Sequence, residues 1–292
     1  MNRKRRLLIP LFLAALVAAV TPLTALAATD PLLNSAGNFA VLSGAGMTNT
    51  GPSWITGAIG ASSAGITGFP PGTAGPKHVG DSAFTTAESD LVGTISRANA
   101  EPTTKDYTGV NLGGLTLGPG VYTQTTAPTL TGTLTLSGGG VYIFKIGSTL
   151  VTASGARVSL INGAQPCDIF WVVGSSATIA TTTTFVGNIM AVAQIAMQTG
   201  ATLNGRALSQ TAAVTLDTNR IIQPYGCIGG FTTSYPAPTY VPPPFGNILP
   251  ATLGVPSELL AEIPWLLVIG IGTGGAALAL VISSRRRRRS SV

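Results

Sequence analysis

From Leu115 to Ile222, apolar residues alternate with polar ones in short runs, and the runs end at glycine, asparagine or threonine. A period of two together with β-branched side chains is typical of β-strands that bury one side. Three of these runs can be superimposed so that Arg157, Thr184 and Thr202 occupy equivalent positions. The pattern therefore predicts similar strands at equivalent places of a repeated structure.

The residue that follows each of these three positions is apolar: Val158, Phe185 and Leu203. Alternation predicts that these apolar side chains point inward and that the residues before them point outward. The equivalent positions are 27 residues apart (157 to 184) and then 18 apart (184 to 202). Unequal spacing with shared corners favours a mostly β fold, an irregular β-helix (solenoid) whose coils differ in loop length. A β-sandwich is the alternative for a chain with many short strands.

One segment has a helical period. From Asp81 onward, apolar side chains recur at steps of three or four residues, which predicts one long α-helix with a single apolar stripe. Asp81 or Ser82 can cap its start, and Pro102 ends it. We expect the helix to lie along the solenoid. Its stripe consists of Phe84, Ala87, Leu91, Ile95 and Ala98.

The N-terminal residues 1–27 contain a basic run (3–6), an apolar stretch (7–20) and a small-residue exit (25–27). This is the pattern of a secretory signal peptide that is cleaved after Ala27. An N-terminal membrane anchor is the alternative, but the apolar stretch is short for a span and contains Pro10. We therefore expect export, with a folded domain over residues 28–227.

The C-terminal residues 265–282 form an uncharged apolar stretch, followed by two serines and five arginines. The stretch is about one bilayer thickness long, and positive charge stays on the cytoplasmic side of a membrane. We predict a C-terminal transmembrane helix over 265–282 and a basic cytoplasmic tail over 283–292. A buried core helix and a nucleic-acid-binding tail are less simple alternatives.

Between the domain and this span, residues 228–264 hold eight of the twenty prolines, which predicts an extended stalk. Within it, Leu249, Pro250, Ala251 and Thr252 resemble the sorting signal that sortases cleave, although Leu253 stands where that signal has glycine. We favour a membrane anchor on the extracellular face of the cell. Covalent attachment to the cell wall by a sortase is the alternative.

Charge narrows the choice of partners. The chain has 16 Lys+Arg and 10 Asp+Glu, a net charge of +6 and an isoelectric point near 9.7. Nine of the cations lie in the two terminal runs. The remainder of the chain has seven cations and ten acids and therefore a net charge of about −3. This excludes the basic surface that a nucleic-acid-binding protein needs. With 9% charged residues and 37 glycines, a helical bundle is also excluded.

Candidate chemistry is sparse. Cys167 and Cys227 both lie in the exported part, where an even pair predicts a disulfide. Two cysteines and the single His78 cannot supply a metal site, and no cofactor is implied. Acidic and basic residues are scattered, without a Ser/His/Asp set or a phosphate loop. The sequence therefore predicts that the protein is not an enzyme.

Six passages occur in a distinctive order between residues 32 and 223: 39–44, 56–60, 118–122, 168–174, 185–189 and 204–208. In sequence and order they resemble the family of secreted ice-binding proteins found in bacteria, fungi and microalgae. The resemblance implies an irregular right-handed β-helix with one long α-helix packed alongside. It also implies adsorption to an ice crystal surface through a flat, threonine-rich face.

In that family one face carries loose Thr-(Ala/Gly)-x-(Thr/Asn) steps, which residues 199–202 fit and residues 181–184 fit except at the second position. Residues 154–157 depart from the pattern because they end in Arg157. Strands stacked about 4.8 Å apart, close to a lattice spacing of ice, would repeat the threonines regularly. The candidate ice-binding residues are Thr152, Thr181, Thr182, Thr184, Thr199, Thr202 and Thr218. A surface adhesin of the same fold that binds a glycan or another cell is the alternative.

Overall fold

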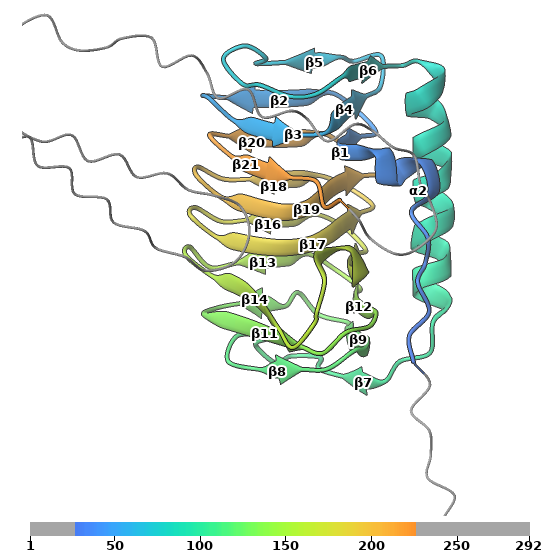
Figure 1. Cartoon of the computed structure of the whole chain (residues 1–292), viewed down its shortest axis with the longest axis vertical. Coiled ribbons are helices and arrows are strands. Elements are labelled where there is room, and N and C mark those ends of the chain that lie inside the picture. Colours follow the sequence, from blue (N-terminus) through green and yellow to red (C-terminus); the bar gives the residue numbers. More distant parts are fainter. Residues whose placement is uncertain (1–26, 226–292) are drawn as a thin grey trace, which may run out of the picture. The chain divides into compact units, whose positions relative to one another are not determined.

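The paired strands that the structure describes are all parallel, and they stack into coils with three faces (Figure 1). A computed structural model describes residues 27–225. Parallel stacking excludes the β-sandwich, whose sheets are antiparallel. The predicted β-solenoid with one long helix alongside is confirmed.

One face lies under the helix and belongs to a 14-stranded sheet. Its strands, in spatial order, are β6 (Lys77–Val79), β4 (Ala58–Ala61), β1 (Phe39–Ser43), β19 (Thr202–Ser209), β17 (Thr184–Ala191), β15 (Ile169–Val173), β12 (Tyr142–Ile146), β9 (Gly120–Gln124) and β7 (Lys105–Asp106).

A second face branches from the same sheet. It contains the first halves of β17 and β19 together with β3 (Trp54–Thr56), β21 (Arg220–Ile222), β14 (Arg157–Ile161), β11 (Thr133–Ser137) and β8 (Thr116–Leu117). We call it the arginine face, after Arg157 and Arg220.

The third face is a separate seven-stranded sheet, which we call the seven-stranded face. Its order is β10 (Thr129–Leu130), β13 (Leu150–Thr152), β16 (Ala177–Ile179), β18 (Ile195–Met197), β20 (Val214–Asp217), β2 (Met47–Thr50) and β5 (Ile66–Thr67).

The alignment expected from the sequence is correct. Arg157 pairs with Thr184, and Thr184 pairs with Thr202, in adjacent strands. The residues that follow, Phe185 and Leu203, are buried as predicted. The sequence pattern thus identified true neighbours across strands that lie 18 and 27 residues apart.

Glycines bend the two longest strands from one face to the next. β17 and β19 each have eight residues, and their corner residues Gly187 and Gly205 have φ values of 110° and 158°. A Cβ on Gly205 would lie 1.9 Å from the carbonyl oxygen of Gly187. Only glycine therefore allows these two strands to turn the corner in contact.

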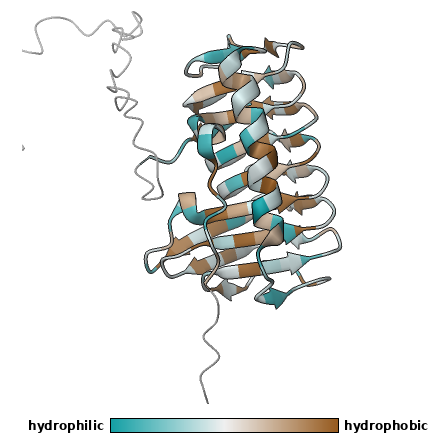
Figure 2. Ribbon diagram, turned by 90° about the vertical axis from the view of Figure 1, so that its right-hand side faces the viewer, coloured by the Kyte–Doolittle hydropathy of each residue, from teal (hydrophilic) through white to brown (hydrophobic). Residues whose placement is uncertain are grey.

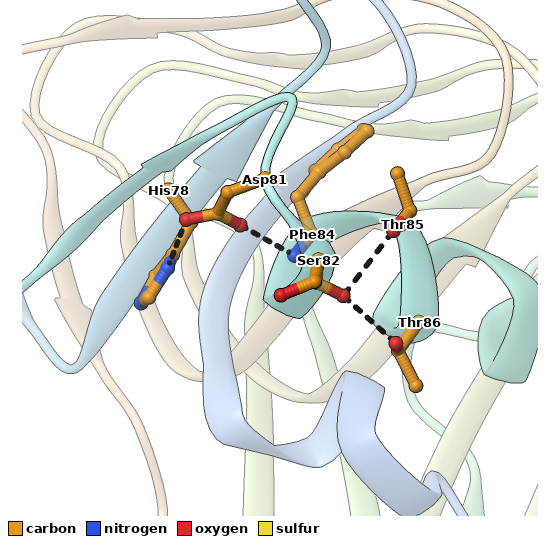
Figure 3. Close-up of polar contacts among 6 residues, drawn as sticks. All are labelled: His78, Asp81, Ser82, Phe84, Thr85 and Thr86. Carbon is orange, nitrogen blue, oxygen red and sulfur yellow. Dashed lines mark hydrogen bonds and ion pairs between the residues drawn. The ribbon is translucent and has the colours of Figure 1, made fainter.

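The helix α2 (Ser82–Ala100) leaves β6 at one end of the solenoid and leads to β7 at the other (Figure 1). The Asp81 side chain caps it by accepting a 2.9 Å hydrogen bond from the backbone N–H of Phe84, and His78 Nδ1 lies 2.8 Å from the other carboxylate oxygen (Figure 3). Figure 2 shows the helix running across the strands behind it. All five predicted stripe residues are buried against this face.

Two short 3₁₀ segments complete the described elements. η2 (Asn34–Asn38) precedes β1, and η3 (Pro166–Asp168) precedes β15. η2 also packs against α2, where the Ser35 N–H and hydroxyl donate to the Asp90 carboxylate. The N-terminal segment therefore fastens to the helix before the first coil begins.

The interior contains a column of aromatic rings. Phe144 and Trp171 are stacked with ring centroids 4.0 Å apart, and Tyr122 and Phe185 extend the column on either side. Trp171 Nε1 donates to the Val186 carbonyl oxygen at 2.9 Å, so its polar atom is satisfied. Burial, with the nearby Tyr107 and Tyr142, raises the pKa of Tyr122 to about 12. The four aromatic side chains of the column therefore stabilise the interior and are not available at the surface.

Several expectations fall outside the described residues. They concern the signal peptide (1–27, except its last residue), the stalk (228–264), residues 249–252 that resemble a sorting signal, the span (265–282) and the tail (283–292). Within residues 27–225, no helix has the length and apolar character needed to cross a bilayer.

Candidate functional site

The seven-stranded face has a continuous row to which each strand contributes one outward-facing residue, and β2 and β20 add a second outward pair, Thr50 and Asp217, toward the corner. Strand register aligns the row from β10 to β5 without interruption. Its members are Thr129, Val151, Thr178, Ala196, Thr215, Thr48 and Thr67. All are exposed or half-buried, and none is charged. Neighbouring strands lie about 4.8 Å apart, so the row is a regular ladder of methyl and hydroxyl groups.

The sequence predictions missed this row. Its strands have two to four residues, too few for alternation to be recognised. In addition, Thr48 lies beside Thr215 because β2 from the start of the solenoid segment of the sequence pairs with β20 from its end. The available signal was weak: each residue of the row has an apolar neighbour in its strand, and that neighbour is buried in every strand except β5.

The corner between the seven-stranded face and the arginine face holds four of the predicted site residues. Thr182, Thr199 and Thr218 are exposed, and Thr181 is half-buried. Both Thr199 and Thr218 donate their hydroxyl hydrogens to the Asp217 carboxylate, one to each oxygen. This carboxylate therefore holds two of the corner threonines in fixed orientations.

The corner threonines also have unusual backbones. Thr182 and Thr218 have φ values of 56° and 53°, whereas the corresponding corners of other coils carry glycine, with φ values of 70° at Gly155 and 71° at Gly200. A β-branched residue is strained in this left-handed region, at a cost of about 1–3 kcal/mol. Strain of this kind accumulates at functional sites. Two coils therefore hold threonine where backbone stability alone favours glycine.

Thr152 does not belong to the surface, and this corrects one prediction. Its side chain is 3% exposed because Leu150 and Thr152 both point inward while Val151 points outward. Its hydroxyl accepts a 2.8 Å hydrogen bond from the Ala180 N–H and lies 3.1 Å from the Thr183 hydroxyl. Thr152 closes a buried polar contact between two coils.

Thr184 and Thr202 point outward, but they begin the arginine face. They belong to a registered row with Thr133 and Arg157 on one side and Arg220 and Trp54 on the other. The Arg220 guanidinium carbon lies 5.0 Å from the centroid of the Trp54 ring. Two cations and one large aromatic ring thus interrupt the small residues of this row.

Residues 27–225 give little support for metal binding or for chemistry at cysteine. No group of three or more His, Cys, Asp or Glu side chains between residues 27 and 225 is placed to hold a metal ion. Cys167 lies in η3, and its carbonyl oxygen accepts a 3.0 Å hydrogen bond from Asn188. Its predicted partner Cys227 is outside the described residues, so the disulfide stays a prediction.

The fold and these rows define a class: a β-solenoid that presents flat, regularly spaced surfaces. The family model described as ice-binding-like matches residues 41–222, and the chain belongs to this family. The family consists of ice-binding proteins, not enzymes, which confirms the expectation that the chain is not an enzyme.

Individual relatives agree with the family model. An ice-binding protein of Nostoc sp. (strain HG1) is 44% identical over 202 residues, covering 67% of this chain and 75% of the relative. One of Flavobacterium frigoris (strain PS1) is 36% identical over 214 residues, covering 66% and 76%. The crystal structure of an ice-binding protein from the Antarctic ascomycete Antarctomyces psychrotrophicus superimposes with a TM-score of 0.66 at 39% identity, covering 68% of this chain and 100% of that one.

Proposed function

We propose that this protein adsorbs to ice through the seven-stranded face and the adjoining corner. The observation that carries the proposal is the uncharged row of seven registered residues, five of them threonine. A flat ladder with a spacing close to that of ice can order water in an ice-like layer, whereas strongly hydrated ions would disturb it. The names of the Nostoc, Flavobacterium and Antarctomyces relatives support the same ligand.

The corner extends this surface. Thr181, Thr182, Thr199 and Thr218 form its edge, and Thr184 and Thr202 continue from the corner onto the arginine face. The strain at Thr182 and Thr218 supports a contact role, because glycine would fit the same backbone at lower energy. The proposed surface therefore keeps six of the seven predicted residues and replaces Thr152 with the row of the seven-stranded face.

Ice shaping and thermal hysteresis of the full chain test the proposal. Thr215→Tyr places a bulky ring in the middle of the row and should abolish activity. Thr135→Tyr, on the arginine face away from the corner, is the matched control and should retain it. Thr184→Tyr and Thr202→Tyr then measure how far the ice contact extends past the corner. An inactive wild-type protein would sink the proposal, as would full activity in Thr215→Tyr.

We further propose that the cell displays this surface. Residues 1–27 act as the export signal, residues 228–264 as a stalk, residues 265–282 as a membrane anchor and residues 283–292 as a cytoplasmic tail. The apolar stretches and flanking basic runs of the sequence support this arrangement. An ice-binding domain held on such an anchor would attach the cell to ice. Protease accessibility of the domain on intact cells tests the topology. If a strain without sortase loses the protein from its cell wall and releases it into the medium, the protein is attached to the wall and not anchored in the membrane.

A glycan-binding adhesin of the same fold is the second candidate function. The exposed ring of Trp54 and the two arginines on the arginine face favour it. Because these residues lie on a different face from the uncharged row, ice binding and glycan binding need not exclude one another.

A further inference from the structure

Arg157 and Arg220 stand apart from the other described arginines. Arg97 donates to the carbonyl oxygens of Pro31 and Leu32, and Arg206 donates to Gly37 O and Asn188 Oδ1. Those two guanidinium groups therefore hold the N-terminal segment in place. Neither Arg157 nor Arg220 makes a side-chain hydrogen bond or an ion pair with any residue between 27 and 225. Arg220 packs over the Trp54 ring, but the N–H groups of both guanidinium ions have no acceptor within residues 27–225.

Both arginines lie in the same row of the same face. Thr184 and Thr202 separate them in register, so they are three strand spacings apart, about 14 Å along the solenoid. Both are exposed, and the intervening residues carry hydroxyl groups. This geometry suits an extended ligand that lies along the row more than a small ion.

The chemistry of the face is complementary to an anion. Neither β3, β8, β11, β14 and β21 nor the first halves of β17 and β19 contain an acidic residue. Of the eight acids that the structure describes, Asp81, Glu88, Asp90 and Glu101 lie on α2 and its ends. Asp217 lies at the corner beside this face, where its carboxylate already accepts hydrogen bonds from Thr199 and Thr218. The arginine face is therefore positive although the part of the chain between the terminal runs is slightly acidic.

The aromatic ring next to Arg220 adds a second recognition element. Trp54 is 43% exposed, and its ring lies under the Arg220 guanidinium at 5.0 Å. Stacking orients the guanidinium, and a planar guanidinium binds a carboxylate through two parallel hydrogen bonds. The uncovered part of the ring offers an apolar surface to the C–H groups of a sugar. Carboxylate, hydroxyl and apolar contacts together are what a uronic-acid chain requires.

We propose that the arginine face binds a carboxylated polysaccharide, with Arg157 and Arg220 pairing with carboxylates and Trp54 stacking on a sugar ring. The ligand lies along the row, with Thr184 and Thr202 beneath it. The proposal rests on the second candidate function, glycan binding, and not on the row of the seven-stranded face, although the ligand shares Thr184 and Thr202 with the edge of the proposed ice contact. A protein with both surfaces would attach an acidic extracellular polymer to ice.

The probe is alginate, a polymer of uronic acids, and its binding to the full chain is measured by titration. Both terminal cation runs, 3–6 and 285–289, are replaced by glutamine in every variant, because they would bind any polyanion. Dextran and alginate with esterified carboxyl groups are the uncharged comparisons. We expect binding to alginate and little binding to either comparison.

The decisive variant is Arg157→Gln/Arg220→Gln, for which we expect affinity for alginate to fall about tenfold or more, since two charge-assisted pairs are lost. The matched control Lys77→Gln/Lys105→Gln removes two exposed cations from the end strands of the face under the helix and should change affinity by less than about twofold. Trp54→Leu should weaken binding and keep the thermal midpoint unchanged. Equal losses in the two double variants, or no preference for alginate over dextran in the unsubstituted face, would overturn the proposal. Ice activity of the same proteins is recorded separately, so the two functions fail independently.

Discussion

The seven-stranded face and the arginine face share one scaffold but differ in what they present. Both are parallel, registered and supported from behind by the same interior. On the seven-stranded face every outward residue of the central row is Thr, Ala or Val. On the arginine face the equivalent row contains two arginines and a tryptophan. Inward residues therefore set the shape of a face, and the outward ones decide its ligand.

The largest expected effect removes the support that both faces share. Trp171→Ala deletes a fully buried ring stacked on Phe144 and leaves a cavity, so the free energy of unfolding should fall by about 3–5 kcal/mol. Chemical denaturation measures this change. Ice and alginate binding should be lost together at temperatures where the variant unfolds, and loss of only one would mean that the faces are supported separately.

The next prediction concerns a substitution that gives the seven-stranded face a residue typical of the arginine face. Thr178→Arg introduces into the row of the seven-stranded face the residue that Arg157 supplies to the arginine face. Because Thr178 is half-buried on the surface, stability should change by less than about 0.5 kcal/mol. Thermal hysteresis should fall about tenfold, as a hydrated cation disturbs the ordered water layer. The reciprocal Arg157→Thr should leave hysteresis intact, and a comparable loss there would place the ice contact on the arginine face.

A smaller effect separates stability from activity at the corner between the faces. Thr182→Gly relieves a left-handed β-branched residue, and we expect a gain of about 1 kcal/mol in the free energy of unfolding. Thermal hysteresis should nevertheless decrease, because the hydroxyl and methyl groups are lost. Gly155→Ala, at a glycine corner with the same backbone, should destabilise the protein. A more stable variant with unchanged hysteresis would remove Thr182 from the ice contact.

Low pH should weaken the packing of the helix, which depends on a carboxylate, more than it affects the surfaces of the two other faces. The Ser35 hydroxyl, followed by its backbone N–H, lowers the pKa of Asp90, while partial burial opposes the shift. A lowered pKa in the folded state stabilises the protein above the unfolded value near 4, and this contribution is lost as the pH falls through the folded value. The thermal midpoint should therefore decrease as the pH falls below about 4, the unfolded value.

Asp90→Asn should reduce that pH dependence. Glu88→Gln lies on the same helix and is the control, because its carboxylate has no hydrogen bond within residues 27–225. Ice activity measured well below the thermal midpoint should vary little with pH. An unchanged slope in Asp90→Asn would show that other carboxylates dominate the acid response.

The sequence predicted those parts of the molecule in which a pattern is long and local. The helix has five turns of consistent spacing and an aspartate at its cap, so its position and buried stripe were predictable. The alignment of Arg157, Thr184 and Thr202 was predictable because their strands have five to eight residues.

The central row of the site was not predictable for two physical reasons. Its strands are too short to display alternation, and its register depends on pairing between the two ends of the chain, as between Thr48 and Thr215. The error at Thr152 has a related cause. The strand Leu150–Thr152 has only three residues, of which the first and third point inward, and such a short strand does not show from its sequence whether its threonine is buried or exposed.

The helix also limits how this surface can grow. α2 has 19 residues and is about 28 Å long. The nine strands of the face beneath it are separated by eight steps, about 38 Å in all, so the helix and the segments that flank it bridge the solenoid together. Because the helix and its flanking segments join the two ends of the solenoid, duplication of one coil would enlarge the surface only if the helix gained about three residues or these segments lengthened by about 4.8 Å. Enlargement in evolution or by engineering therefore requires matched insertions at two distant points of the gene, and the size of the contact area should be strongly restricted within the fold.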